Sequence, residues 1–255
     1  TNDEVTETIV FLHGFTGSSK TWEPVIKRLP TSIRCIAVDL LGHGKTESPK
    51  QSERYQMREQ VIDLHTLLNS LHISDFTLVG YSMGGRIALA YALTYPDHVK
   101  RLVLESASPG IQSVDEQQTR IKADESLANK IDHEGLDAFI DFWQDIPLFQ
   151  SQKNLPEIKR QAIRQERLQQ SALGLVNSLK GMGTGSQPSY WSQLNELKLP
   201  VTLITGELDE KFQLIAQQMK NRIANSQHIE VLGVGHAIHV ENPVQFATII
   251  MEQMK

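Results

Sequence analysis

The sequence predicts a single α/β domain, in which helices flank a mostly parallel sheet and a helical insertion covers one end of the strands. Short runs rich in β-branched and aromatic residues alternate with amphipathic helical stretches in the first half and again near the end. Between about Pro109 and Leu197 this alternation stops, and the chain becomes rich in Gln, Lys, Arg and Glu. Because 255 residues can form one domain with a sizeable core, we expect residues 1–255 to be one domain with a cap insertion at about 109–197.

The first strands and helices follow one another in chain order. Apolar residues recur at helical spacing between the second and third strands, which predicts a helix with one buried stripe. Inside the insertion, the segment 136–143 has a helical pattern, and a helix is expected over Phe212–Ile223. A last helix should begin near Pro243, because proline fits the first turn. The predicted strands are Thr8–His13, Arg34–Asp39, Phe76–Tyr81, Arg101–Ser106, Val201–Thr205 and His228–Leu232.

Charge and cysteine content exclude several classes of protein. The 25 Lys and Arg residues against 30 Asp and Glu give a net charge of −5, and the cations are scattered. A general binder of nucleic acid or of an anionic membrane needs a concentrated positive face, so neither partner is expected. The chain shows no targeting segment and no membrane-spanning apolar run, which predicts a cytoplasmic protein. Cys35 is the only cysteine and lies in a predicted strand, where we expect an unreactive core thiol.

The segment Gly80-Tyr-Ser-Met-Gly84 places a G-x-S-x-G motif directly after a predicted strand and directly before a helical pattern. Glycines permit the tight turn that exposes a serine hydroxyl, here that of Ser82, at the edge of a sheet. The backbone N–H of Met83 would then point toward an oxyanion forming beside it. The alternative is a glycine-rich turn with an idle serine.

A serine hydroxyl needs an imidazole to take its proton and a carboxylate to orient that imidazole. Asp209 and His236 each follow a late predicted strand, in the chain order Ser, Asp, His. Glu207 is the alternative acid, although its position directly after Gly206 favours the other side of the loop. His239 is the alternative imidazole, and it could also form a metal pair with His236. Because a metal pair at that spacing needs a helix, a structural role for His239 and no metal site are expected.

A second glycine turn follows the first strand in Phe11-Leu-His-Gly-Phe-Thr-Gly17. The backbone N–H of Phe15 is the candidate second donor of an oxyanion hole, opposite that of Met83. A simple strand-terminal turn is the alternative for this segment. His43 lies in a further glycine loop and is expected to be structural.

Through HGF, DLLGHGKTES, GYSMGG, GELD and GHAIH, the chain resembles the α/β-hydrolase superfamily over essentially its whole length. The resemblance implies the fold and a catalytic triad of Ser82, Asp209 and His236. It does not determine the reaction, because this scaffold carries esterases, carbon–carbon hydrolases, lyases and non-catalytic receptors.

Arg86 narrows the choice of reaction. It lies one turn into the helix after Ser82, where the positive end of the helix dipole disfavours a cation. We therefore expect it to bind an anion, or alternatively to pair with an acid such as Glu105. The insertion adds further cations, and two or three of them facing inward would form a pocket for a carboxylate-rich substrate. These cap residues are Arg120, Arg160, Arg164 and Arg167.

GYSMGGR, ESASPGI and GHAIHVENP resemble one family in particular, the 2-succinyl-6-hydroxy-2,4-cyclohexadiene-1-carboxylate synthases of menaquinone biosynthesis. The resemblance implies a lyase that eliminates pyruvate from an enolpyruvyl cyclohexene bearing a succinyl ketone and carboxylates. It matches the family's later cap arginine to Arg167, with Arg164 as the alternative. The substrate-binding residues that it implies are Arg86, Arg120, Arg167, Tyr81 and Trp143.

In the mechanism that we expect, His236 and Asp209 polarise Ser82, whose oxygen removes a ring proton, while the Phe15 and Met83 amides stabilise charge on the succinyl carbonyl. The substrate is a small anionic carboxylate, and nothing in the sequence indicates a metal, nucleotide or flavin cofactor. One alternative is a cofactor-independent hydrolase that uses Ser82 as a covalent nucleophile. Another is a receptor without turnover.

Overall fold

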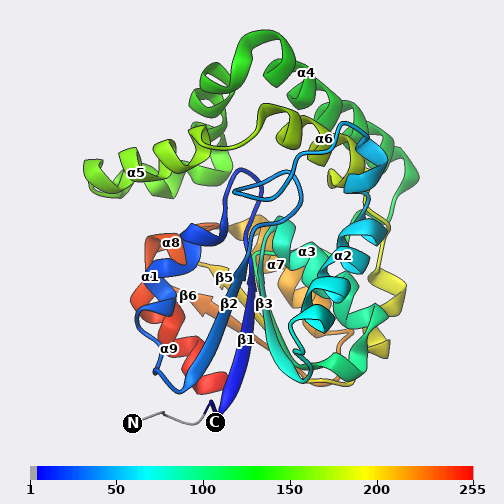
Figure 1. The fold of residues 1–255 in the computed structure, drawn as a ribbon, viewed down its shortest axis with the longest axis vertical. Coiled ribbons are helices and arrows are strands. Elements are labelled where there is room, and N and C mark those ends of the chain that lie inside the picture. Colours follow the sequence, from blue (N-terminus) through cyan, green and yellow to red (C-terminus); the bar gives the residue numbers. More distant parts are fainter. Residues whose placement is uncertain (1–4, 255) are drawn as a thin grey trace.

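The computed structural model describes residues 5–254, which form a six-stranded, wholly parallel sheet in the order β2-β1-β3-β4-β5-β6 (Figure 1). Helices cover both faces of this sheet, which confirms the predicted α/β class. The strands are β1 (Glu7–Leu12), β2 (Ile33–Val38), β3 (Phe76–Tyr81), β4 (Val99–Glu105), β5 (Val201–Gly206) and β6 (Ser226–Val231).

The ends of the strands follow their neighbours in the sheet. Strand β3 has the predicted bounds, whereas β4 begins two residues earlier than predicted, at Val99, which pairs with Phe76. Strand β6 begins at Ser226, opposite Val201 of β5. Backbone pairing determines where a strand starts, and side-chain pattern reports it only indirectly.

The two faces of the sheet bury alternate side chains of the same strand. The helices of the two faces are α1 (Glu23–Ile26), α2 (Met57–Ser70), α3 (Met83–Thr94), α7 (Glu210–Lys220), α8 (Ile238–Glu241) and α9 (Pro243–Gln253). On β1, Val10 and Leu12 belong to the core beneath α2 and α3, whereas Ile9 and Phe11 belong to the core beneath α1 and α9. Helix α9 starts at Pro243 as expected, and the Asn242 side chain caps it.

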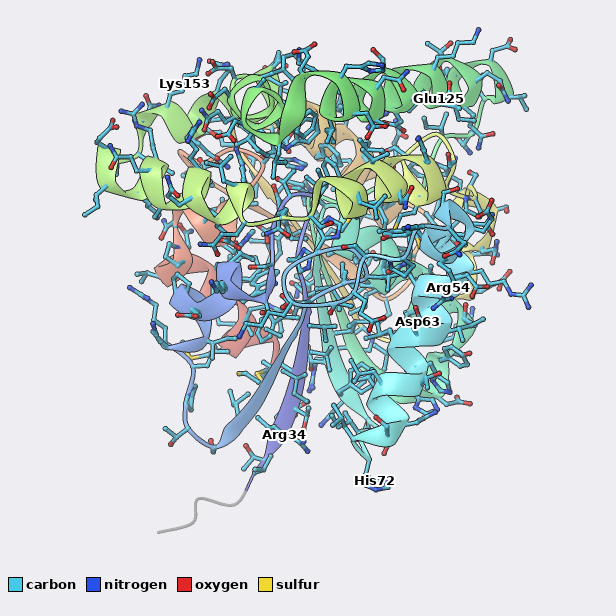
Figure 2. The ribbon with its side chains drawn as sticks, turned by 45° about the horizontal axis from the view of Figure 1, so that its top comes forward. Arg34, Arg54, Asp63, His72, Glu125 and Lys153 are labelled. Atoms are coloured by element: carbon cyan, nitrogen blue, oxygen red, sulfur yellow. The ribbon has the colours of Figure 1, made fainter. Side chains whose placement is uncertain are left out.

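Between β4 and β5 the chain forms helices only, and the helices within residues 114–182 lie above the carboxyl ends of the strands (Figure 1). We call residues 114–196 the cap. Its helices enclose an apolar cluster of their own that includes Ile131, Phe139 and Leu175, while Glu125 and Lys153 lie at its outer surface (Figure 2). The elements of the cap are α4 (Val114–Gln144), η4 (Pro147–Asn154), α5 (Glu157–Leu168), α6 (Ala172–Met182) and η5 (Trp191–Glu196). A left-handed residue, Gly135 (φ +84°), interrupts α4.

Short 3-10 helices also occur outside the cap, as η1 (Ser19–Trp22), η2 (Ser52–Tyr55) and η3 (Pro96–His98). Cys35 lies on the edge strand β2 and is only half-buried, so its expected place in the core is wrong. Burial nevertheless raises the pKa of its thiol to about 11, which keeps the thiol protonated at neutral pH and disfavours reactivity. No helix within residues 5–254 has the length and apolar character needed to cross a bilayer.

Candidate active site

Ser82 occupies a strained turn between β3 and α3. Its φ of +48° and ψ of −106° lie outside the usual regions for a residue with a side chain, a conformation that costs about 1–3 kcal/mol and survives only where its surroundings impose it. The backbone N–H of Ser82 donates to the carbonyl of Glu105 on the next strand at 2.9 Å. The hydroxyl is thereby carried beyond the end of the sheet.

The glycines of the motif permit this turn because backbone segments approach them closely. A Cβ on Gly80 would lie 2.5 Å from the carbonyl oxygen of Gly84, and one on Gly84 would lie 2.3 Å from that of Leu12. Neither neighbour is a flexible side chain that could give way. The expected reason for these glycines, a turn too tight for side chains, is therefore visible in the geometry.

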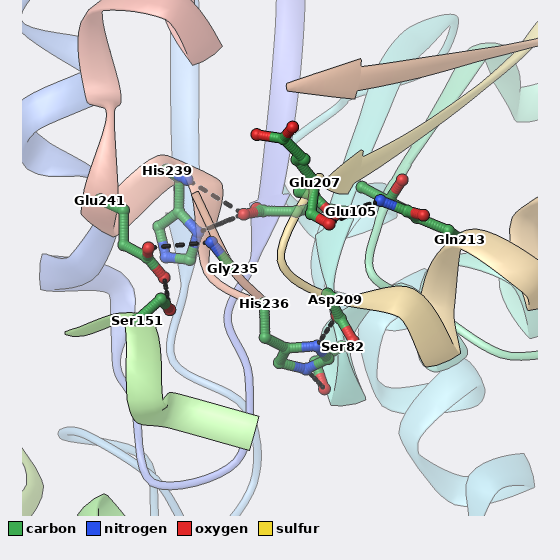
Figure 3. A network of polar contacts seen from close by, with 12 residues as sticks. Ser82, Glu105, Ser151, Glu207, Asp209, Gln213, Gly235, His236, His239 and Glu241 are labelled. Atoms are coloured by element: carbon green, nitrogen blue, oxygen red, sulfur yellow. Dashed lines mark hydrogen bonds and ion pairs between the residues drawn. The ribbon is translucent and has the colours of Figure 1, made fainter. Parts of the chain in front are cut away.

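Ser82, His236 and Asp209 form a continuous chain of hydrogen bonds (Figure 3). The Nε2 atom of His236 lies 3.1 Å from Ser82 Oγ, and Nδ1 lies 2.6 Å from Asp209 Oδ2. Since an ionised carboxylate only accepts, Nδ1–H donates to Asp209 and Nε2 is left to accept the serine proton. His236 and Asp209 are both buried. They come from the loops after β6 and β5, which meet at the carboxyl edge of the sheet.

The alternative acid and imidazole have other partners. The Oε2 atom of Glu207 accepts from the backbone N–H of Gly233 at 2.8 Å and makes no hydrogen bond to His236 within residues 5–254. His239 contacts the buried carboxylate of Glu105 through Nδ1 at 2.9 Å, and its ring stacks on Trp22 at 4.3 Å. His239 thus packs the interior beside the site, as expected. It also takes the acid that we considered for Arg86.

The loop after β1 brings Phe15 to the same cavity as Ser82 and Met83. Buried His13 shapes this loop, because its Nε2 accepts from the Leu40 N–H at 3.1 Å and its Nδ1–H donates to the Gly14 carbonyl at 2.8 Å. Within residues 5–254, the Phe15 N–H has no protein acceptor, and Met83 is the first residue of α3, where N–H groups lack intrahelical acceptors. Both donors are therefore available to a ligand.

A cavity of about 620 Å³ lies between the cap and the carboxyl ends of the strands, and Ser82 and His236 line it. Aromatic side chains form much of its wall. A recess of about 270 Å³ shares Ser82, Arg86 and Arg120 with the cavity. The aromatic residues of the wall are Phe15, Tyr81, Trp143, Phe149 and Phe212.

Arg86 is buried beside this cavity without a carboxylate partner in the described part of the chain. Its Nη1 donates to the Met182 carbonyl at 2.7 Å and to Gln187 Oε1 at 2.8 Å, so the considered ion pair with Glu105 is wrong. Burial, and secondarily the charge of Arg120, lower the pKa of Arg86 to about 10. The guanidinium therefore stays protonated at neutral pH and can attract an anion.

The cap arginines differ in what they face. Arg120 lines the cavity and also pairs with Asp124 at 2.8 Å. Arg167 is buried and is not among the residues that line the cavity, and its guanidinium carbon lies 4.7 Å from the centre of the Phe149 ring, which does line it. A direct contact of Arg167 with a substrate stays a prediction.

The other two predicted cap arginines form ion pairs within the cap and do not line the cavity. Arg164, the alternative to Arg167, binds Asp141 at 2.7 Å, and Arg160 pairs with Glu157. Phe149 was not anticipated from the sequence, because it lies in the irregular segment η4, where no periodicity indicates which side chains face inward. Its ring contacts that of His236 at 6.1 Å between centroids.

Comparison with known proteins identifies the family. The model of the alpha/beta hydrolase fold family matches residues 7–243. A putative 2-succinyl-6-hydroxy-2,4-cyclohexadiene-1-carboxylate synthase of Bacillus subtilis is 47% identical over 96% of this chain and 89% of its own length. The synthase of Salmonella typhimurium is 32% identical over 93% of this chain and 90% of its own.

Solved structures agree. MenH from S. aureus superimposes with a TM-score of 0.94 at 38% identity, over 99% of this chain and 94% of that one. An enol-lactonase from Burkholderia xenovorans, at 20% identity and a TM-score of 0.85 over 100% and 93% of the two chains, shares the fold. The resemblance inferred from the motifs is confirmed: the chain belongs to the α/β-hydrolase superfamily and, within it, to the family of 2-succinyl-6-hydroxy-2,4-cyclohexadiene-1-carboxylate synthases.

Proposed function

We propose that the chain is a lyase of menaquinone biosynthesis that eliminates pyruvate from 2-succinyl-5-enolpyruvyl-6-hydroxy-3-cyclohexene-1-carboxylate, giving 2-succinyl-6-hydroxy-2,4-cyclohexadiene-1-carboxylate. One observation carries the proposal beyond family membership. The same cavity is lined by the Ser82–His236–Asp209 chain and by Arg86, a buried arginine that has no acid partner among residues 5–254. That combination suits proton removal from a substrate with several carboxylates.

In the proposed reaction, Ser82 Oγ removes the ring proton next to the succinyl ketone and passes its own proton to His236 Nε2. The electron pair of the broken C–H bond moves onto the ketone oxygen, where the N–H groups of Phe15 and Met83 stabilise the charge. The pair then returns through the ring double bond and breaks the C–O bond to the enolpyruvyl group. The departing enolate takes up a proton to become pyruvate, and no acyl-enzyme forms.

The arginines are proposed to orient the substrate. Arg86 and Arg120 line both the cavity and its recess, so carboxylates held there would present the acidic C–H to Ser82. Tyr81 and Trp143 shape the pocket for the ring. Burial raises the pKa of the Tyr81 phenol well above its ordinary value, so it remains neutral. Because the Arg167 guanidinium packs on the Phe149 ring, we propose that Arg167 supports this aromatic wall.

The deciding assay supplies the enolpyruvyl precursor and follows pyruvate release together with the absorbance of the conjugated diene. One pyruvate for each diene, at a rate abolished by Ser82→Ala, is the expected result. Pyruvate release no faster than the spontaneous reaction would exclude the lyase.

A covalent serine hydrolase is the second candidate, because the same hydrogen-bonded geometry activates a serine for attack on an ester or ketone carbonyl. It predicts burst release of a chromophoric acid and an acyl group trapped on Ser82. The lyase predicts neither with its own substrate.

A further inference from the structure

The carboxylate of Glu241 joins the cap to the loop that carries His236 (Figure 3). Its Oε1 accepts a hydrogen bond from Ser151 Oγ at 2.9 Å, and its Oε2 accepts one from the backbone N–H of Gly235 at 2.9 Å. Gly235 directly precedes His236 in the chain. One side chain therefore contacts both the cap and the backbone that positions the imidazole.

Close packing leaves little freedom around these contacts. A Cβ on Gly235 would lie 2.1 Å from Ser151 Oγ, so the cap serine rests directly on the backbone of the His236 loop. On the other side, a Cβ on Gly206 would lie 2.2 Å from the Gly235 carbonyl oxygen. Gly235 is thus held between the cap and the end of β5, the strand that leads to Asp209.

The cap segment that Glu241 reaches also forms the wall of the cavity. Ser151 belongs to η4, as does Phe149, whose ring lines the cavity and lies 6.1 Å from the His236 ring. A shift of η4 would change the shape of the pocket, and a shift of Gly235 would change the direction of the imidazole. The two positions are coupled through one carboxylate.

Other hydrogen bonds between the cap and the core end elsewhere. The Ser18 hydroxyl donates to Glu166 of α5 at 2.7 Å, and Asn177 of α6 donates to the Pro49 carbonyl at 2.9 Å. These bonds hold the cap on the loops after β1 and β2. Among the side-chain hydrogen bonds of residues 5–254, the one from Ser151 to Glu241 links the cap to the segment 233–242.

We propose that Glu241 is a positioning residue, which holds His236 at hydrogen-bonding distance from Ser82 and seats η4 on the cavity at the same time. The inference rests on the proposed role of His236 as the base that activates Ser82. Glu241 would act by fixing the position of His236, since displacing a reacting group by about 1 Å can lower the rate about a hundredfold.

The test uses a small fluorophosphonate, which reacts with an activated serine whatever the natural substrate is. Glu241→Met keeps the length of the side chain and removes both acceptors, so the rate of Ser82 phosphonylation should fall about tenfold or more. Glu241→Gln can still accept from Gly235 and can donate to Ser151, so its rate should stay within about threefold of the parent. Asn177→Leu is the matched control, because it breaks cap bonds to the carbonyls of Pro49 and Lys50 and touches neither the His236 loop nor the loop of Phe15, and it should react at the parental rate.

Turnover of the enolpyruvyl precursor tests the second part of the proposal, that Glu241 holds η4 against the cavity through Ser151. Ser151→Ala leaves the bond to Gly235 intact, so KM should rise severalfold with kcat nearly unchanged. Parental phosphonylation by folded Glu241→Met, or equal slowing by Asn177→Leu, would overturn the proposal, as would an unchanged KM in Ser151→Ala.

Should Glu241→Met not fold, Glu241→Asp decides, because the shorter carboxylate cannot span both partners and should also slow phosphonylation. Reaction of Glu241→Asp at the parental rate would refute the inference. The unsubstituted protein could release no pyruvate while the variants still show the predicted order of phosphonylation rates. That result would exclude the proposed lyase activity and would still support the positioning role of Glu241.

Discussion

Arg86 places a positive charge in the buried wall of the cavity, where water cannot solvate it well. Its carbonyl and amide partners supply hydrogen bonds but no countercharge. We expect Arg86→Ala to raise KM and lower kcat/KM by about tenfold to a hundredfold, because hydrogen bonds to charged groups contribute about 1.5–3 kcal/mol. Steady-state kinetics with the enolpyruvyl precursor measure this effect.

Arg160→Ala is the control for that substitution, because Arg160 pairs with Glu157 on the outer surface and should leave both constants unchanged. Unaltered kinetics in a folded Arg86→Ala variant would show that Arg86 only supports the cap through Met182 and Gln187.

His13 makes the stability of the fold depend on pH. Burial lowers its pKa from 6.5 to about 4, so the unfolded chain binds more protons than the folded chain between these values. Its contribution is complete above pH 6.5 and is lost as the pH falls toward 4, to a total of about 3 kcal/mol. Buried His43, with a pKa lowered to about 3, acts in the same direction.

The free energy of unfolding, measured with urea at pH 7, 6 and 5, should fall as the pH falls, because of the lowered pKa of His13. His13→Asn, which keeps a donor for the Gly14 carbonyl, should flatten the pH dependence, whereas substitution of exposed His133 should not. An equally steep dependence in His13→Asn would refute this account.

At the scale of elements, the junction of β3 and α3 depends on the absence of side chains. Gly84→Ala places a Cβ against the main chain of β1, so we expect a loss of several kcal/mol or no folded protein. Gly135→Ala in α4 meets no atom within 4 Å and bears only the cost of its backbone conformation (φ +84°, ψ 167°), about 1–3 kcal/mol. Thermal unfolding of the two variants measures the loss of stability caused by steric crowding at Gly84 and by backbone strain at Gly135. Equal losses of stability in the two variants would contradict this explanation.

The same elements show what the sequence could and could not predict. The strands are recognisable because a parallel strand buried on both faces is a continuous apolar run, and the loops of Ser82, Asp209 and His236 follow because parallel strands end at one edge. No comparable rule predicts from the sequence which side chains of the cap face the cavity. Arg164 and Arg167 lie on the same amphipathic helix, and only packing reveals that one pairs with Asp141 while the other lies against the ring of Phe149.

For the whole molecule, the net charge of −5 opposes the approach of an anionic substrate, whereas Arg86 and Arg120 attract it locally. Salt screens the exposed charges more than a buried one, over about 8–10 Å at physiological ionic strength. We expect KM to rise with salt where the attraction to the arginines dominates. The salt dependence should be shallower in Arg120→Ala, since Arg120 is the more exposed of the two, and a KM that falls with salt would show that the net charge dominates.

The single half-buried thiol of Cys35 makes the molecule convenient for fluorescence work. With its pKa near 11, it should react slowly with a maleimide dye at neutral pH. Cysteines introduced at Lys153, on the outside of the cap, and at His72, at the far end of the sheet, would then be labelled selectively (Figure 2). Single-molecule energy transfer between those two dyes would then measure changes in the distance between the cap and the far end of the sheet.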